Sequence, residues 1–213
     1  MQALEKIANS TNWISLVLVL LLGMIAVLKT IDSEKLKGYV FAIFNKGFIE
    51  DEVEGDTSFF SPFYSLLFLF SALVLALVIS LIAAPNKTGL PVSFSTFTVT
   101  FSIVFSYFVI KSLLEVALSS LFLIKKQLRF YIVSKFGYLY CISFVLLICF
   151  VVCQFGPLNV SGLLCITLLL FFIRFLFHVK NNKNLIFSEL FYFILYLCAF
   201  EIAPLLTLFK LML

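Results

Sequence analysis

The feature that most constrains this chain is a series of apolar runs, each about 20 residues long. Folded as an α-helix with a rise of 1.5 Å per residue, a run of that length crosses about 30 Å of hydrocarbon. No run shows the alternation with a period of two that is typical of a transmembrane strand. The sequence therefore predicts an all-α, polytopic bundle of about six transmembrane helices, at roughly 12–29, 61–84, 92–111, 136–153, 158–177 and 186–209.

The composition is that of a chain that must be covered by lipid. Of its 213 residues, 63% are hydrophobic and 12% are charged, whereas soluble proteins carry about 25% charged residues. We therefore expect a single integral membrane domain over residues 1–213. Its expected partner is the lipid bilayer, and we expect no nucleic acid to bind.

The first predicted loop, residues 30–60, combines a helical pattern with a cluster of acids. Leu36, Tyr39 and Ile43 recur at helical spacing beside lysines, which predicts a helix lying in the membrane interface. The sequence EDEVEGD at residues 50–56 then contains five of the 11 acidic residues of the chain. Such a run predicts a solvated turn.

The segment 92–127 runs for 36 residues without glycine or proline. As one straight helix it would measure about 54 Å, which exceeds the hydrocarbon thickness. It therefore either projects from the membrane or bends near Lys111 into a second helix in the interface. The helical spacing of the polar residues after Lys111 favours the bend.

Lysine and arginine are distributed unevenly between the two sides that six spans define. Loops one, three and five contain 12 of the 15 basic residues. Because short loops rich in these residues stay on the cytoplasmic side, we predict that all three loops are cytoplasmic. Both termini then lie on the opposite side of the membrane.

The third predicted span carries most of the candidate polar residues. Ser102 and Ser106 belong to one stripe of hydroxyls, and Tyr107 and Lys111 belong to another. These stripes either line a polar cavity or supply hydrogen bonds between packed helices, which is the more common use of hydroxyls in membrane bundles. Lys111 and Glu115 are spaced for an intrahelical pair, although the opposite order would be the stronger one.

The last two predicted spans contribute three further candidates. Arg174 and Glu189 lie near the cytoplasmic ends of adjacent spans, where they could pair across a helical hairpin and fix how the helices meet. Glu201 lies inside the last apolar run, three residues before Pro204. A carboxyl at that depth is costly unless it faces protein, water or a cation. Glu201 is therefore the strongest single functional candidate.

Motifs for known chemistry are missing from the sequence. It contains no nucleophile motif, no glycine-rich phosphate loop and no HExxH. The five cysteines lie inside apolar runs without metal-ligand spacing, so we interpret them as packing residues. We expect no catalytic residue, no metal site, no cofactor and no enzymatic activity.

The ending LYLCAFEIAPLLTLFK, from Leu195 to Lys210, resembles a bacterial inner-membrane family catalogued as domain of unknown function 4271, which is typical of Bacteroidota. The preceding FIRFLFHVKNNK and the helix SFSTFTVTFSIVFSYFVIKSLL share this resemblance, which covers the latter two thirds of the chain. It implies a multi-pass protein of the inner membrane in a Gram-negative bacterium. Together with the charge distribution, this location predicts periplasmic termini. It implies no particular activity or ligand.

These observations favour an uncharacterised multi-pass protein that serves as a non-catalytic accessory or assembly subunit in a cell-envelope process. Its further partners would be other membrane proteins of the envelope. The alternative is a small transporter or lipid-handling carrier that uses the polar face of the third span and Glu201. A third interpretation is an intramembrane enzyme that acts on a lipid-linked substrate.

Overall fold

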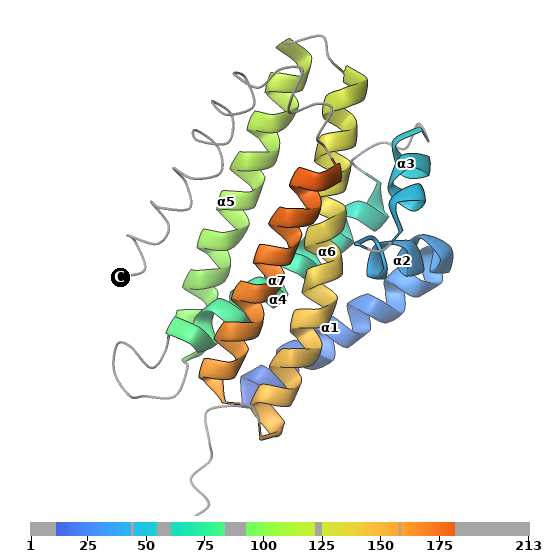
Figure 1. The fold of residues 1–213 in the computed structure, drawn as a ribbon. Helices are drawn as coiled ribbons and strands as arrows, with labels where there is room; N and C mark the ends of the chain where they lie inside the picture. Colours follow the sequence, from blue (N-terminus) through green and yellow to red (C-terminus); the bar gives the residue numbers. More distant parts are fainter. Residues whose placement is uncertain are drawn as a thin grey trace, which may run out of the picture.

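Among the residues that the computed structural model describes there are seven helices and no strand, and Figure 1 shows how these helices are arranged. The described residues are 12–43, 45–54, 61–83, 93–121, 125–157 and 159–181, without the side chains of residues 12, 46, 54, 114–132 and 178–181. The helices are α1 Asn12–Ile31, α2 Ser33–Val40, α3 Lys46–Glu54, α4 Pro62–Ala83, α5 Phe94–Leu121, α6 Lys125–Phe155 and α7 Val160–Asn181.

Within this part of the chain, five helices contain a segment that is long and apolar enough to cross a membrane. Each segment overlaps one of the first five predicted spans, which confirms the predicted helical membrane bundle. The sixth predicted span, 186–209, lies outside the described residues. The five segments are Trp13–Ile31, Pro62–Ala83, Phe94–Leu113, Val133–Phe155 and Val160–Phe177.

The core of the bundle lies around α4 and α6. In the apolar windows of these two helices 56% of the residues are buried, against 17% in α5 and 6% in α7. Phe70 of α4 and Leu146 of α6 are fully enclosed, and α4 packs against α1, α5, α6 and α7. The helices α5 and α7 therefore flank the core and leave most of their surface outside it.

The helix α5 continues well past Lys111, so the expected bend at that residue is wrong. Its 28 residues, Phe94–Leu121, correspond to about 42 Å, and the 31 residues of α6 correspond to about 46 Å. Both helices exceed the 30 Å or so of hydrocarbon. In Figure 1 the end of α5 and the start of α6 lie together at the top of the bundle. The two helices therefore form a hairpin that is longer than the hydrocarbon layer is thick.

Residues 33–54 form a cap of two short helices, α2 and α3, on one side of the bundle (Figure 1). The helix predicted in the first loop is present as α2, which packs on α1 and α6. The spacing of Leu36 and Tyr39 predicted a helix in the membrane interface. In the structure both residues are buried against side chains of α1, α4 and α6. Their side of α2 therefore faces protein.

The acidic segment is helical as far as Glu54, so the predicted turn is wrong for these residues, although Glu50 and Asp51 are exposed to solvent as predicted. The helix α3 packs on α6 and buries Ile49 and Val53, which helical spacing places on one face. Residues 55 and 56 lie outside the described part of the chain.

Gly38 marks the closest approach between the two helices of the cap. A Cβ atom added at Gly38 would overlap the ring of Phe48 on α3. That ring also stands edge-on to the ring of Tyr39, with the centroids 5.1 Å apart. The packing of α3 on α2 therefore depends on the missing side chain at residue 38.

Candidate functional site

Three polar side chains from three helices meet where the cap rests on the bundle. Asp32 caps α2 by accepting hydrogen bonds from two backbone N–H groups, at 3.2 and 2.9 Å, and so fixes the first turn that carries Lys35. Glu52 comes from the last turn of α3. Tyr64 comes from the first turn of α4, which begins at Pro62. We call this group the Lys35–Glu52–Tyr64 cluster.

The cluster is connected by hydrogen bonds and an ion pair. The Nζ atom of Lys35 lies 3.5 Å from Oε1 of Glu52 and 3.5 Å from the hydroxyl oxygen of Tyr64. The Tyr64 hydroxyl donates a hydrogen bond to the same Glu52 oxygen. The Glu52 side chain is only 7% exposed, against 31% for Lys35. The carboxylate is therefore withdrawn from water, and its two partners compensate for a desolvation that would otherwise cost several kcal/mol.

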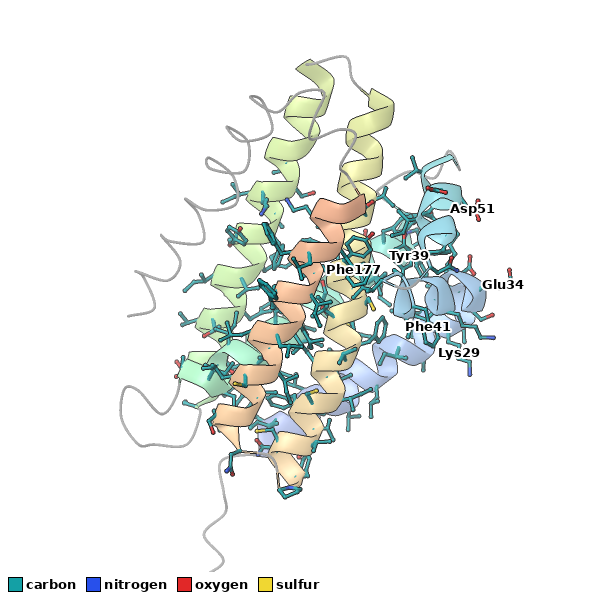
Figure 2. The ribbon with its side chains drawn as sticks, in the orientation of Figure 1. Lys29, Glu34, Tyr39, Phe41, Asp51 and Phe177 are labelled. Atoms are coloured by element: carbon teal, nitrogen blue, oxygen red, sulfur yellow. The ribbon has the colours of Figure 1, made fainter. Side chains whose placement is uncertain are left out.

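Tyr39 lies beside this cluster at the centre of an aromatic group. Its ring centroid is 6.1 Å from that of Tyr64 and 5.6 Å from that of Tyr140 on α6. Figure 2 shows Tyr39 directed toward the bundle. Burial raises the pKa of Tyr39 above its ordinary value, and the charge of Glu52 and then Tyr140 raise this pKa further. Tyr39 therefore keeps its proton at neutral pH.

The geometry of the cluster suits a structural joint between α2, α3 and α4. A general base must reach a substrate proton, whereas the Glu52 carboxylate is buried and already accepts from Tyr64 and Lys35. A second link joins the cap to α6, because the Cys141 thiol donates to the carbonyl oxygen of Val40 at 2.9 Å. Among the described residues, no group of three or more His, Cys, Asp or Glu side chains could bind a metal ion.

Of the predicted pair on α5, the structure describes one side chain. The Lys111 Nζ atom donates to the Tyr107 hydroxyl at 3.3 Å and lies 5.5 Å from the centroid of that ring. Tyr107 is one turn before Lys111, whereas Glu115 is one turn after it. The Glu115 side chain is outside the described part, so the predicted Lys111–Glu115 pair stays a prediction.

Arg174 has a partner that the sequence did not indicate. Its Nη2 atom donates to the backbone carbonyl oxygen of Lys135 on α6 at 3.1 Å, and its guanidinium lies 5.8 Å from the ring centroid of Phe171. Arg174 thus links α7 to α6. Glu189, the predicted partner, is outside the described residues, as is Glu201.

Ser102 and Ser106 point outward from α5, where both are exposed. The Ser102 hydroxyl donates to the backbone carbonyl of Thr98 at 2.9 Å. The described candidates therefore do not converge on one site. Lys111 and Tyr107 pair on α5, Arg174 joins α7 to α6, and the two serines face away from the core.

The sequence analysis missed Lys35, Glu52 and Tyr64. Glu52 was grouped with its acidic neighbours because five acids in seven residues suggested solvent. The spacing of Ile49 and Val53 indicates the opposite, because residues four apart lie on one face of a helix. That pattern predicts a helix with a buried side, and Glu52 precedes Val53 on that side.

The comparisons with known proteins identify a family and nothing more specific. The comparison with curated proteins and the comparison with solved structures found no match. A family model described as a domain of unknown function, 4271, matches residues 14–212. This match takes in all of α1 except its first two residues and the whole of the other described helices, including the cap, and it continues through the predicted sixth span. The chain therefore belongs to the family of domain of unknown function 4271.

Proposed function

We propose that this protein is a non-catalytic accessory or assembly subunit of the bacterial inner membrane, and that it binds another envelope protein through its cap. The observation that carries this proposal is the construction of the first loop. Its two helices are fixed to the bundle by the Lys35–Glu52–Tyr64 cluster and by the Cys141–Val40 hydrogen bond. A loop that only connected two spans would not need such fixation, whereas a binding surface gains affinity from preorganisation.

The chemistry of the exposed side of the cap indicates the kind of partner. Glu34 and Asp51 are exposed, and Figure 2 shows both directed away from the bundle. Acidic side chains on a fixed surface favour encounter with a basic surface. The partner that fits is a protein segment rich in lysine and arginine that lies close to the membrane.

We further propose that the cap faces the cytoplasm and that both termini face the periplasm. The support is the charge distribution, with 12 of the 15 basic residues in loops one, three and five. The inner membrane is supported by the family resemblance. If the cap lies in the cytoplasm, the protein segment that binds it must lie there too.

Copurification in mild detergent, followed by mass spectrometry of proteins and lipids, tests the proposed role. We expect one or more proteins with the wild type and their loss when both exposed acids are reversed (E34K with D51K). The matched control is K37E, which alters an exposed residue of α2 but keeps the surface acidic. Equal recovery of the same proteins with E34K/D51K, or recovery of lipids alone, would contradict the proposal.

The exposed hydroxyls of α5 favour a second candidate, a small carrier that uses this face together with Glu201. Ser95, Thr98, Ser102 and Ser106 are all exposed on a membrane-spanning segment. A carrier requires water or a substrate to reach these hydroxyls. Labelling of single cysteines at Thr98 and Ser102 by a small polar thiol reagent would support the carrier, and protection of both would count against it.

A further inference from the structure

Among the described side chains of the cap, Phe41 is the large apolar one that is exposed. It directly follows α2 and is 59% exposed. In Figure 2 Phe41 lies on the lower side of the cap, whereas Asp51 lies at its upper end. The apolar face of α2 itself, with Leu36 and Tyr39, is covered by the bundle. Phe41 is therefore an apolar surface that the packing of the cap leaves uncovered.

The depth of Phe41 follows from the contact between the cap and α6. The preceding residue, Val40, accepts a hydrogen bond from the Cys141 thiol at 2.9 Å. Cys141 lies eight residues past the start of the apolar segment Val133–Phe155, or about 12 Å along the helix. The 23 residues of that segment are about 4 Å longer than the hydrocarbon layer is thick, so Cys141 lies about 10 Å inside the layer. Lipid tails, and not headgroups, surround a protein at this depth.

The surface of α6 below this contact is apolar and exposed. Val145, Ile148 and Val152 follow Cys141 at helical spacing, which places all four on one face of the helix. The three apolar residues are exposed, and lipid tails suit such a face of a membrane-spanning segment. Phe41 lies at the upper end of this face, because the residue before it contacts Cys141.

The backbone at the end of α2 is suited to surroundings without water. Four carbonyl oxygens there accept hydrogen bonds from donors within the protein. They belong to Lys37, Tyr39, Val40 and Phe41. The donor to Val40 is a thiol from another helix. Because lipid tails offer the backbone no hydrogen bonds, a helix end at membrane depth requires internal donors of this kind.

We propose that Phe41 inserts among the acyl chains of the bilayer beside Val145 and Ile148, and so anchors one edge of the cap in the leaflet on its side of the membrane. Asp51, at the other end of the cap, remains in water. The depth of the Cys141 contact, the exposure of the ring and the internal hydrogen bonds of the backbone all fit a phospholipid tail as the occupant. The anchor does not depend on the partner proposed for the acidic side of the cap.

The fluorescence of a single tryptophan tests this contact. Trp13 is the only tryptophan of the chain, so W13F removes the background and keeps an aromatic ring. In the full chain with W13F, F41W is reconstituted into phosphatidylcholine vesicles with brominated or unbrominated acyl chains. The matched controls are L22W, at the exposed middle of the α1 segment, and D51W on the cap. We expect brominated chains to quench F41W about as strongly as L22W and to leave D51W unquenched.

The position of the bromine along the chain tests the depth. Bromine near the headgroup end should quench F41W more than bromine near the end of the chain, and the order should be reversed for L22W. The difference in emission between F41W and wild type, measured with Trp13 retained, gives the same comparison without W13F. Quenching of F41W no stronger than that of D51W would overturn the proposal.

Iodide on both sides of the vesicles separates water from protein at this position. We expect iodide to quench D51W and to leave F41W unquenched. Quenching of F41W by iodide, and not by brominated lipid, would place Phe41 in water. Protection of F41W from both quenchers would show that a second copy or another protein covers Phe41, which also overturns the proposal.

Discussion

Glu52 and Asp51 are adjacent acids of α3 with different surroundings. Asp51 is exposed, whereas Glu52 is buried between Lys35 and Tyr64. Their positions around the helix account for this difference: at about 100° per residue, Glu52 lies at the edge of the face that carries Ile49 and Val53, whereas Asp51 lies opposite that face. The charge of Glu52 is therefore paired within the fold, whereas the charge of Asp51 faces solvent.

The substitution E52Q should lower the stability of the protein. The amide keeps a hydrogen-bond acceptor for Tyr64 but leaves the Lys35 ammonium without its counter-ion, and hydrogen bonds to charged groups contribute about 1.5–3 kcal/mol. Because Lys35 is partly exposed, water screens the pair, and we expect a smaller loss of about 1–2 kcal/mol. Thermal unfolding in detergent measures it, with D51N as the control. An equal midpoint for E52Q and wild type would show that the ion pair contributes nothing.

The raised pKa of Tyr39 predicts that the stability of the protein falls at alkaline pH. Its folded-state pKa is raised, chiefly by burial and then by Glu52 and Tyr140, above the ordinary value of 10.0. A group that binds its proton more tightly in the folded state stabilises the fold below its unfolded pKa and loses this contribution as the pH rises above it. Thermal midpoints from about pH 8 to 11 should therefore fall more steeply for wild type than for Y39F. Parallel curves would refute the prediction.

Among the helices, the spans were predictable and the ends of α5 and the cap were not. Length and apolarity alone define a span, so the first five were located within a few residues. The continuation of α5 beyond Lys111 depends on helical hydrogen bonds that can also form outside lipid, and no glycine or proline interrupts them. The contact between Glu52 and Tyr64 joins two helices across an intervening loop, and local periodicity carries no information about such a pair.

The packing of α3 on α2 predicts that the protein is sensitive to substitution of Gly38. G38A should displace the ring of Phe48, because a Cβ at this position overlaps it, and overpacking typically costs about 1–3 kcal/mol. G137A is the matched control, since a Cβ there would lie 3.6 Å from the nearest atom of Tyr39, an ordinary contact. Limited proteolysis of the cap and thermal unfolding in detergent measure both. If G38A matches G137A in both assays, the ring of Phe48 moves aside without loss.

For the whole molecule, the proposed orientation predicts which surfaces an impermeant thiol reagent can reach. D51C on the cap should be protected when the reagent is added to cells with a permeabilised outer membrane, because loop one is assigned to the cytoplasm. N159C, in the exposed turn before α7, should be labelled, and both should react after lysis. Labelling of D51C but not of N159C in unlysed cells would reverse the orientation.

The hydrogen bond between Cys141 and Val40 joins residues that are 101 positions apart in the chain. During synthesis at about 5–20 residues per second, the cap therefore leaves the ribosome on the order of 5–20 seconds before the part of α6 on which it rests. Throughout that interval Leu36 and Tyr39 lack their neighbour Tyr140 of α6. The lysines beside them suit binding to the membrane interface. The pattern that predicts an interfacial helix therefore fits α2 before the fourth span is synthesised, and not in the folded protein.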